Sequence, residues 1–453
     1  MIEKIHPRVL EIYKRLQNAG FEVYFVGGCV RNLLLNVAPK DWDLTTNATP
    51  QELQAVFPDS FYDNAFGTVG VPLPSVEEQE HKNVVEITTY RTESSYKDHR
   101  KPSAVSWGKT IEEDLSRRDF TINAIALTFN PEEKIIDLYG GQKDLEKKII
   151  RAVGNPEERF KEDALRLLRA VRFATQLSFS IEESTMKAIV ADGNLIEHIS
   201  GERIRDELLK ILSSDSYYEG VMLLDATGLL DYILPELKLG KGVSQERPGR
   251  HHTTDVFTHN VLSLKHTPSV DAIVRLATLL HDVGKPKVRS EDEDGLVIFY
   301  NHEVAGARIA REVSDRLRLS KEQRNKIVTL IRWHMFTIDE HITDSAVRRF
   351  IRRIGLENVK DMIDLRIGDR LGSGTKTAES WRLKKFKERI EEQLHPPFSI
   401  NDLKVNGNDI MEILKIKPGP KIGEILQKLF EECDEDLSLN NREHLLERIK
   451  ELQ

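Results

Sequence analysis

The sequence changes character near residue 150, and this change limits the folds that the chain can adopt. Before it, short runs of β-branched and aromatic residues predict strands at 22–26, 41–46, 68–72, 84–89 and 134–137. After it, Leu and Ile recur at the three- and four-residue spacing of helices, for example over 157–177, 184–190, 201–213, 216–226, 303–317, 321–334 and 344–353. The sequence therefore predicts an α+β fold with a mixed head and a long all-α part behind it.

Composition narrows the class of protein. A chain of 453 residues is long enough for about three domains. Its formal net charge of −8 argues against a surface coated in basic charge for nonspecific nucleic-acid or membrane binding, although it permits a local basic groove. No apolar run reaches the length of about 18 residues that a transmembrane helix needs, and Cys29 and Cys433 lack metal-binding spacing. We therefore expect a cytoplasmic protein with no membrane partner.

The first chemical signal is a double glycine, Gly27-Gly28, at the end of a predicted strand. Glycine lets the backbone approach a phosphate group closely, and a helix after it offers its N–H groups to the anion. Arg31 falls on the first turn of that helix, where its guanidinium is placed to hold a phosphate oxygen. A glycine pair alone is most often a simple turn, so the prediction of a nucleotide site depends on the next residues of the chain.

Two carboxylates, Asp41 and Asp43, come next, at a spacing that places both on one face of a strand. A cation relieves their repulsion, so the pair predicts a Mg²⁺ site, whereas a solvated turn after Pro39 is the alternative. Glu86 is either a third carboxylate or a strand-edge glutamate. Mg²⁺ held in this way supports two-metal nucleotidyl transfer, with Asp41 and Asp43 as the catalytic residues.

A second motif reads Arg117-Arg118-Asp119-Phe-Thr-Ile-Asn123-Ala. Taken alone, it is typical of a capped helix start with a salt bridge. With a triphosphate site upstream, Arg118 becomes a phosphate ligand and Asp119 an acceptor for a ribose hydroxyl. We count Asn123 of the same motif among the nucleotide-binding residues.

A third motif, Glu162-Asp163-Ala-Leu-Arg166, continues into Arg169 and Arg172. On a helix, Asp163 and Arg166 share a face, and the later arginines extend a stripe that is separate from the apolar core face. A surface ladder of salt bridges is the alternative interpretation.

Asp163 and Arg166 can together select a base, because aspartate only accepts hydrogen bonds and arginine only donates them. Cytosine presents its N4 amine beside the N3 acceptor, and adenine its N6 amine beside N1, so both bases match the pair. Uracil and guanine present the reverse order and would leave buried groups unpaired, at a cost of about 1–3 kcal/mol for each group. The pair therefore predicts a site that accepts CTP and ATP and rejects UTP and GTP.

In this order, the motifs resemble those of the class II tRNA nucleotidyltransferases, the CCA-adding enzymes, which share an ancestor with bacterial poly(A) polymerases. The resemblance continues through 199–207 and 402–409 and so covers nearly the whole chain. Two positions depart from the family pattern, because Asn32 stands where Asp is usual and Asn36 where glycine is common.

The resemblance implies a polymerase-β-like head with a mixed sheet, and a helical neck, body and tail that hold the acceptor stem and 3′ end of tRNA. It implies that Asp41 and Asp43 bind Mg²⁺, that Asp119 contacts the ribose, and that Asp163 with Arg166 replaces a template. The residues that would hold the triphosphate and frame the pocket are Gly27, Gly28, Arg31, Arg118, Arg169 and Arg172.

The subtype is inferred from residues 91–102. Relatives that add only CC look shortened between the first two motifs, whereas this segment has the length expected of enzymes that reach the terminal A. We therefore expect full CCA addition. The alternatives are A-only addition, CC-only addition and poly(A) synthesis, and the last is disfavoured because those relatives tend to carry more basic bodies.

A second constellation, with the pattern H…HD…H…H…D, lies in the helical part and resembles the HD phosphohydrolase superfamily. Imidazoles with carboxylates suit one or two divalent transition-metal ions. The expected metal ligands are His259, His281, Asp282 and Asp369, with His302 and His334 completing a second ion site. Lys285 is expected near a substrate phosphate, whereas His251 and His252 precede the domain and are not expected to be ligands.

We accordingly expect a nucleotidyltransferase head over 1–150, a helical neck with the nucleotide-selecting motif over 151–240, an HD metal-binding domain over 245–375 and a tRNA-binding tail over 376–453. The arginines at 348–349 and 352–353 and within 382–389 are expected to follow the tRNA backbone. The HD domain either hydrolyses phosphate esters or is a retained structural module. A purely RNA-binding protein conflicts with the pair Asp41 and Asp43.

Overall fold

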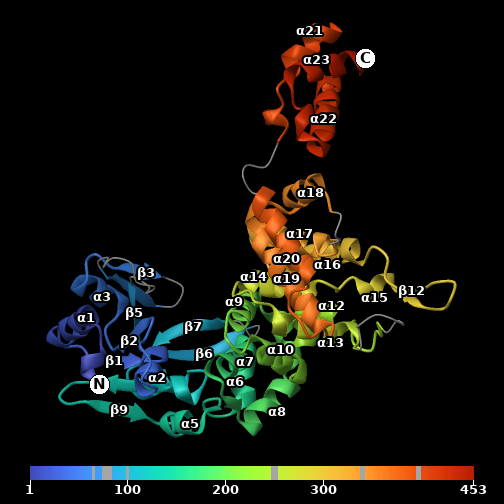
Figure 1. Ribbon diagram of the computed structural model, residues 1–453. Coiled ribbons are helices and arrows are strands. Elements are labelled where there is room, and N and C mark those ends of the chain that lie inside the picture. Colours follow the sequence, from blue (N-terminus) through green and yellow to red (C-terminus); the bar gives the residue numbers. More distant parts are fainter. Residues whose placement is uncertain are drawn as a thin grey trace. The chain divides into compact units, whose positions relative to one another are not determined.

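The computed structural model describes residues 1–63, 67–73, 84–97, 101–245, 254–336, 342–393 and 399–452, and of 63, 92–97 and 101–106 the backbone only (Figure 1). The chain divides into two compact units. The first comprises Met1–Lys238 with Arg316–Leu319, and the second Leu239–Asp315 with Ser320–Gln453. The two histidines that are not expected to be metal ligands, His251 and His252, lie outside the described residues.

A seven-stranded mixed sheet forms the core of the head. The strand order is β3-β4-β5-β2-β1-β8-β9, in which β2 and β5 run parallel and the other neighbours run antiparallel. The strands are β1 Val23–Val26, β2 Trp42–Thr46, β3 Phe61–Asp63, β4 Thr68–Pro72, β5 Val84–Thr89, β8 Ile125–Thr128 and β9 Lys134–Asp137. The prediction of an α+β head with a mixed sheet is confirmed.

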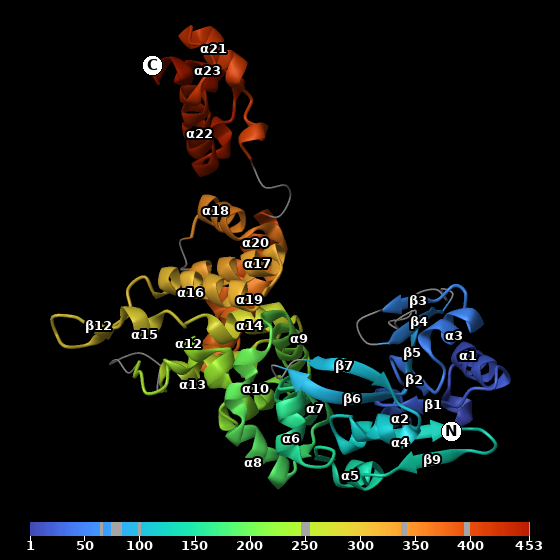
Figure 2. The ribbon, with the colours of Figure 1, turned by 180° about the vertical axis from the view of Figure 1, so that it is seen from behind.

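The helices of the head cover this sheet, and Figure 2 shows them from behind. They are η1 Ile2–Lys4, α1 Pro7–Asn18, α2 Gly28–Leu34, α3 Pro50–Val56, α4 Ile111–Ser116, η2 Thr121–Asn123 and α5 Gly141–Lys147. The apolar face of α1 is buried, and its Tyr13 ring stacks on Phe25 of β1 with centroids 5.1 Å apart. A separate antiparallel hairpin joins β6 Arg91–Lys97 to β7 Lys101–Trp107. This hairpin carries most of the segment that predicts the subtype, of which 98–100 lie outside the described residues.

Helices make up the rest of the first unit. They are α6 Pro156–Glu162, α7 Leu165–Leu177, α8 Glu183–Ala191, η3 Gly193–His198, α9 Gly201–Leu212, α10 Tyr217–Ala226, α11 Leu230–Ile233 and α12 Pro235–Lys238, with the short parallel strands β10 Ile149–Ile150 and β11 Ser180–Ile181. α7 is buried along most of its length and packs against α9 and α10. The arginines of α7 therefore project from a helix that this packing holds in place.

The second unit begins with a bundle of helices. They are α13 Val256–His266, α14 Ala272–Leu280, α15 Lys285–Val288, α16 His302–Arg316, α17 Lys321–Trp333, α18 Asp344–Ile354, η4 Leu356–Asn358, α19 Val359–Gly372 and α20 Trp381–Gln393, with the hairpin β12 Ser290–Glu291 and β13 Val297–Ile298. Gly368 and Gly372 let α19 lie so close to α13 that a Cβ at either position would collide with Ser263. This close packing sets Asp369 beside α13.

The last helices form a small core of their own. They are η5 Ile400–Asp402, α21 Gly407–Leu414, α22 Pro420–Glu435, η6 Leu437–Leu439 and α23 Arg442–Glu451, and their buried core includes Ile410, Leu429 and Ile449. Asp434 of α22 accepts hydrogen bonds from Arg348 Nε at 2.7 Å and Arg352 Nη2 at 2.6 Å, both on α18. A buried carboxylate thus joins α22 to α18.

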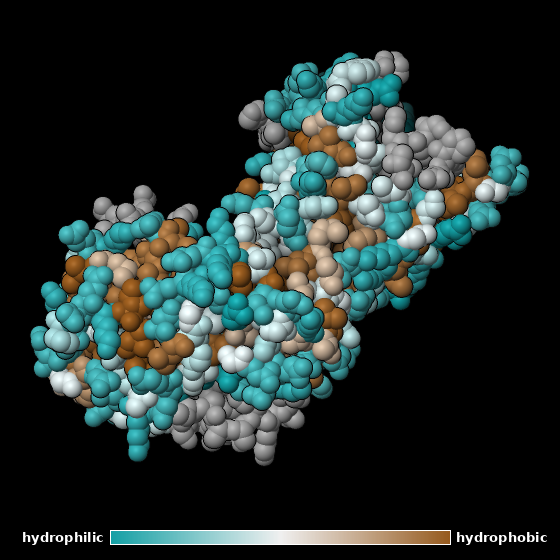
Figure 3. All heavy atoms as spheres, turned by 90° about the horizontal axis from the view of Figure 1, so that it is seen from below, coloured by the Kyte–Doolittle hydropathy of each residue, from teal (hydrophilic) through white to brown (hydrophobic). Residues whose placement is uncertain are grey.

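Hydrophilic side chains cover most of the face that Figure 3 shows, and hydrophobic residues gather there in separate patches. In the described part of the chain, no helix is long and apolar enough to span a membrane.

Candidate nucleotidyl-transfer site and metal cluster

The double glycine forms the turn between β1 and α2. Gly27 has φ +70°, a backbone conformation that favours glycine. A Cβ placed on Gly27 would lie 3.1 Å from Arg118 Nη1 and 3.6 Å from Asp43 Oδ2, and one on Gly28 would lie 3.6 Å from Arg31 Nη2. The turn therefore brings three motifs that are far apart in the sequence to one place.

The carboxylates lie on β2 and at its start. Asp43 is on β2 in register with Glu86 on the parallel strand β5, so the two side chains project from the same face of the sheet. Asp41 is exposed and immediately precedes β2, two residues before Asp43. Carboxylate oxygens on one face are the donors that Mg²⁺ prefers, so this donor set fits the predicted ion.

Arg31 is held from two sides. Its Nη1 donates to Asn123 Oδ1 at 2.9 Å, and its Nε and Nη2 donate to Asn32 Oδ1 at 3.2 and 3.0 Å. Burial and the charge of Arg172 lower the pKa of Arg31 to about 10, so it remains a cation at neutral pH. Asn32, which departs from the family pattern, therefore orients an arginine that is predicted to bind phosphate.

Asp119 is a buried acceptor at the centre of the second motif. Its Oδ2 accepts from Arg169 Nε at 2.8 Å, and its Oδ1 accepts from Asn123 Nδ2 at 3.2 Å and from the Phe120 backbone N–H at 2.8 Å. Burial alone raises the pKa of Asp119, but the charge and hydrogen bonds of Arg169, with Asn123, outweigh it and lower the pKa to about 2. The carboxylate is thus ionised and fixed in orientation.

Three arginines surround the ring of Phe173 on α7. The guanidinium carbons of Arg31, Arg169 and Arg172 lie 5.3, 5.2 and 3.9 Å from its ring centroid. Guanidinium groups are attracted to the face of an aromatic ring, so Phe173 gathers charges that would otherwise repel each other. The resulting positive cluster suits an anionic ligand.

Two buried acids that were not predicted support these arginines. Asp114 accepts from Arg118 Nη2 at 2.9 Å and Arg117 Nε at 3.0 Å, and Glu207 accepts from Arg172 Nε at 2.5 Å. Asp114 precedes its partners by three and four residues, the spacing of a helical ion pair, and this signal could have found it. Glu207 ends the stretch 199–207 that the family resemblance already marked.

Asp163 and Arg166 do not share a helix, so the prediction of one helix over 157–177 is wrong. Asp163 ends α6 in an extended conformation (φ −140°, ψ 103°), and its Oδ1 accepts from the Leu165 backbone N–H at 3.1 Å. Aspartate competes for backbone N–H groups in this way and therefore favours helix ends. The two side chains project from the junction of α6 with α7 and from α7 itself.

Each member of this pair has its own support. Asp163 Oδ2 accepts from Arg203 Nη2 at 2.8 Å. Arg166 donates to Glu162 Oε2 at 2.6 Å, to the Arg159 backbone oxygen at 3.1 Å and to the Arg117 backbone oxygen at 2.8 Å. These contacts fix both side chains, and their role as readers of the base stays a prediction.

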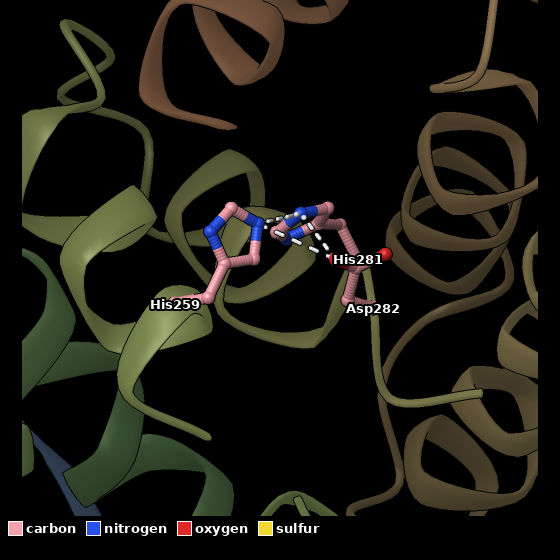
Figure 4. Close-up of side chains that lie close together, drawn as sticks. All are labelled: His259, His281 and Asp282. Atoms are coloured by element: carbon pink, nitrogen blue, oxygen red, sulfur yellow. Dashed lines mark hydrogen bonds and ion pairs between the residues drawn. The ribbon is translucent and has the colours of Figure 1, made fainter. Parts of the chain in front are cut away.

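In the second unit, the predicted HD residues meet in one buried cluster. Figure 4 shows His259, His281 and Asp282 facing one another. His259 Nε2 lies 3.1 Å from His281 Nε2, 3.3 Å from Asp282 Oδ2 and 3.3 Å from Asp369 Oδ1. The ligand atoms of His259, His281 and Asp282 thus lie together, and Asp369 Oδ1 lies beside the two imidazoles.

The other oxygen of Asp282 faces a second group. Asp282 Oδ1 lies 3.2 Å from His302 Nε2 and 3.6 Å from His334 Nε2, and these two nitrogens are 3.4 Å apart. Asp282 is therefore shared by two sets of donors, one with His259 and His281 and one with His302 and His334. Asp282 would therefore supply one oxygen to each of the two groups of residues that would hold metal.

The backbone orients three of these imidazoles. The Nδ1 atoms of His281, His302 and His334 lie 2.8, 2.8 and 2.7 Å from the backbone oxygens of Thr278, Phe299 and Ile331. Donation from Nδ1 leaves the lone pair on Nε2, and metal-binding histidines are oriented by hydrogen bonds of this kind. The donor set therefore fits divalent metal.

The charged side chains of this cluster shift one another's pKa values. Burial raises the pKa of Asp282, but Lys285 and His281 outweigh it and hold the pKa well below its usual value. Burial lowers the pKa of His281, but Asp282 and Asp369 outweigh it and raise the pKa to about 10. Lys285 Nζ lies 2.5 Å from Asp282 Oδ2 and 2.6 Å from Gln245 Oε1. The cluster thus holds ionised carboxylates next to protonated imidazoles. A metal cation that binds there displaces the protons of the imidazoles.

Comparison with known proteins agrees with this geometry. Family models match over three segments: the poly A polymerase head domain at 23–151, a probable RNA and SrmB-binding site of polymerase A at 178–239, and the HD domain at 259–371. A CCA-adding enzyme of Ligilactobacillus salivarius is 33% identical to the chain over 98% of its length and 96% of the relative. The chain belongs to the family of CCA-adding enzymes. An A-adding tRNA nucleotidyltransferase of Deinococcus radiodurans is 36% identical over 71% of the chain and 75% of the relative.

Solved structures give the same assignment. The crystal structure of Bacillus stearothermophilus CCA-adding enzyme in complex with CTP is 27% identical, covers 99% of this chain and 98% of its own, and has a TM-score of 0.71. The Thermotoga maritima CCA-adding enzyme complexed with tRNA covers 99% and 96% at 22% identity, with a TM-score of 0.59, and shares the fold. The family membership inferred from the motifs is confirmed.

Proposed function

We propose that this chain adds CCA to the 3′ ends of tRNA from CTP and ATP, without a nucleic-acid template, and releases pyrophosphate in the cytoplasm. The turn at Gly27 carries this proposal, because the Arg118 guanidinium and the Asp43 carboxylate lie 3.1 and 3.6 Å from the point where a Cβ on Gly27 would be. A carboxylate that can hold a metal, beside a guanidinium that can hold a phosphate, is what transfer from a triphosphate requires. The CCA-adding relatives support the same activity.

Different residues of the head would bind the metal, the triphosphate and the ribose. Asp41 and Asp43 would hold Mg²⁺, which when bound lowers the pKa of the RNA 3′-hydroxyl and stabilises the leaving pyrophosphate. Arg31 and Arg118 bind triphosphate oxygens, since their buried acceptors already fix the direction of each guanidinium. Asp119, ionised and held by Arg169, positions the ribose.

Base choice falls to Asp163 and Arg166. Because each is held by protein groups on a different segment, the acceptor and the donor present a fixed pattern to the base edge. This pattern fits cytosine and adenine and opposes uracil and guanine. The neck 151–240 therefore supplies selection, and the later helices, including the tail 376–453, hold the tRNA.

Label transfer tests the head. With tRNA that ends at the discriminator base, at C or at CC, we expect CTP and ATP to be incorporated and UTP and GTP to fail. Equal use of all four nucleotides would overturn the role of Asp163 and Arg166. Incorporation of A alone would favour the A-adding alternative, failure on the CC-ending tRNA would favour CC addition, and long A tails would favour poly(A) synthesis.

A matched pair of variants tests the carboxylates. Asp41→Ala should abolish all transfer, because the lost ligand removes the metal that activates the 3′-hydroxyl, whereas Asp59→Ala, at an exposed loop position in the same unit, should leave the rate unchanged. Retention of transfer by Asp41→Ala would sink the proposal. Circular dichroism of both variants separates loss of chemistry from loss of fold.

A second activity is favoured by the shared position of Asp282. We infer that the HD cluster binds one or two divalent metal ions and hydrolyses phosphate esters: water adds to phosphorus, the P–O ester bond breaks, and the leaving oxygen takes a proton. Hydrolysis of 2′,3′-cAMP should be lost with EDTA and in His281→Ala/Asp282→Ala, while CCA addition by the same variant persists. Equal hydrolysis rates in all samples would reduce the HD domain to a structural module.

A further inference from the structure

A cavity of about 600 Å³ lies in the second unit, and neither proposed activity assigns it a role. It is lined by residues from two helices and from the segment after α17: Met335, Phe336, Arg366, Arg370, Ser380, Trp381, Arg382 and Leu383. Figures 1 and 2 both draw α17, α19 and α20 side by side. Its volume falls in the range of about 300–1,000 Å³ that is usual for small-molecule sites.

The lining has the chemistry of a nucleotide site. The described residues that line it include three arginines and no carboxylate. Arg366 is paired with Asp369 outside the lining, so the positive charge that attracts an anion comes chiefly from Arg370 and Arg382. Trp381 is 55% exposed, which is unusual for so large an apolar ring, and Phe336 is anchored by stacking on Phe386 with centroids 5.5 Å apart. Aromatic faces beside arginines bind bases by stacking and phosphates by charge.

The cavity adjoins the metal cluster at two points. Arg366 Nη1 donates to Asp369 Oδ2 at 2.9 Å, and the other oxygen of Asp369 lies 3.3 Å from His259 Nε2. Met335 and Phe336 come directly after His334, whose Nε2 faces Asp282. A ligand in the cavity would therefore lie beside the residues that are inferred to bind metal.

We propose that this cavity binds a ribonucleotide that carries a terminal phosphate, with the base against Trp381 and the phosphate among Arg366, Arg370 and Arg382. The proposal rests on the hydrolytic function of the HD cluster only for the fate of the ligand. To that function it adds a binding cavity for the base and the phosphate of a nucleoside phosphate, either free or at the end of an RNA chain.

Calorimetry on the full chain, stripped of metal with EDTA, tests binding without hydrolysis. The probe 3′-AMP should bind more tightly than adenosine or inorganic phosphate, since only 3′-AMP carries both groups. Trp381→Ala should weaken the binding of 3′-AMP roughly 5- to 150-fold, the range for loss of one base stack, and Trp381→Phe should restore most of it. Arg382→Ala should weaken 3′-AMP and inorganic phosphate but not adenosine.

Matched exposed positions outside the cavity serve as controls. Tyr300→Ala removes an aromatic ring that is 72% exposed, and Arg308→Ala removes an exposed arginine on α16, and neither should change the affinity for 3′-AMP. Titration with a short RNA that ends in 3′-phosphate distinguishes an RNA end from the free nucleotide as the source of the ligand. Equal affinity of Trp381→Ala and the unchanged chain for both probes would overturn the proposal.

Measurements of hydrolysis and of tRNA kinetics distinguish the proposed nucleotide cavity from the proposed hydrolase and from a surface that contacts tRNA. If 3′-AMP binds at Trp381 but is not hydrolysed after Mn²⁺ is added, the hydrolase proposal fails and the nucleotide site stands. If Trp381→Ala hydrolyses 3′-AMP with unchanged KM, the hydrolase stands and the nucleotide site is overturned. If Trp381→Ala instead raises the KM for tRNA in CCA addition and leaves 3′-AMP binding intact, the surface contacts tRNA, which also overturns the proposal.

Discussion

At the scale of residues, the predicted triphosphate site of the head depends on the aromatic ring of Phe173 as well as on the arginines around it. Phe173 lies within 5.3 Å of three guanidinium groups that are predicted to hold the triphosphate and frame the pocket. Phe173→Leu should raise the KM for CTP and ATP roughly fivefold, because loss of the ring weakens the placement of the three guanidinium groups by about 1 kcal/mol in total, while kcat for the transfer step changes less. Steady-state kinetics on CC-ending tRNA measures both constants.

Phe160→Leu is the control for this prediction. Phe160 is fully buried on α6, so the substitution removes similar apolar volume from the same unit without touching the arginine cluster. An equal rise in KM in both variants would show that the effect of Phe173→Leu is general loosening of the core.

The residues also show what the sequence could predict of the site. Gly27, Arg31, Arg118, Asp119 and Asn123 meet as expected because each belongs to a short motif with its own turn or helix start. Glu207 and Arg203 were not predicted as partners, since their contacts depend on tertiary packing between segments that no local pattern records. Asp114 lies at helical spacing from Arg117 and Arg118, so its role could have been predicted from the sequence. Asn36 has φ +58°, which explains why relatives commonly have glycine there and why asparagine replaces it.

At the scale of elements, Asp434 joins α22 to α18. Burial raises the pKa of Asp434, but Arg352 and Arg348 outweigh it and lower the pKa below its ordinary value. A carboxyl group with a lowered pKa in the folded state stabilises the fold above its unfolded pKa of about 3.9, and this contribution is lost as the pH falls through the folded value. Asp434→Asn should therefore reduce the free energy of unfolding at pH 7 by up to about 3 kcal/mol.

Thermal unfolding against pH checks this prediction. The difference in Tm between the unchanged chain and Asp434→Asn should be large at pH 7. It should shrink as the pH falls below the unfolded pKa of about 3.9 and through the lower pKa at which folded Asp434 takes up a proton. Glu431→Gln, on the same helix but exposed, is the control and should show no comparable difference at either pH. A Tm difference that is independent of pH would mean that Asp434 acts by packing rather than by charge.

Elements with a strong apolar period were predicted well, and the exception is informative. Strands at 68–72, 84–89 and 134–137 occur as expected, since alternation and β-branched residues act locally. The helix predicted over 157–177 is broken at Asp163, because this residue is extended and its side chain accepts from the Leu165 backbone N–H instead of continuing the first helix. That break changes the relative placement of Asp163 and Arg166, the pair predicted to select the base, and helical spacing could not convey it.

At the scale of the whole molecule, a net charge of −8 has to be reconciled with an RNA partner. Part of the basic charge is used inside the protein: Arg348 is buried against Asp434, and Arg352 also binds that carboxylate. The expectation that Arg348 follows the tRNA backbone is therefore wrong. Arg349 and Arg353 on the same helix are exposed and stay candidates for phosphate contacts.

The salt dependence of tRNA binding distinguishes these two kinds of arginine. Each phosphate contact adds about 0.7–0.9 to the slope of log K against log salt, because one bound counterion is released for each neutralised phosphate. Arg349→Ala should reduce the magnitude of that slope by about 0.7–0.9, the value for one phosphate contact. It should also weaken tRNA binding without changing the Tm. Arg348→Ala should leave the slope unchanged and lower the Tm, since it strips a partner from buried Asp434. Identical slopes for Arg349→Ala and the unchanged chain would remove α18 from the tRNA-binding surface, and the acidic chain would then hold its substrate through other exposed cations.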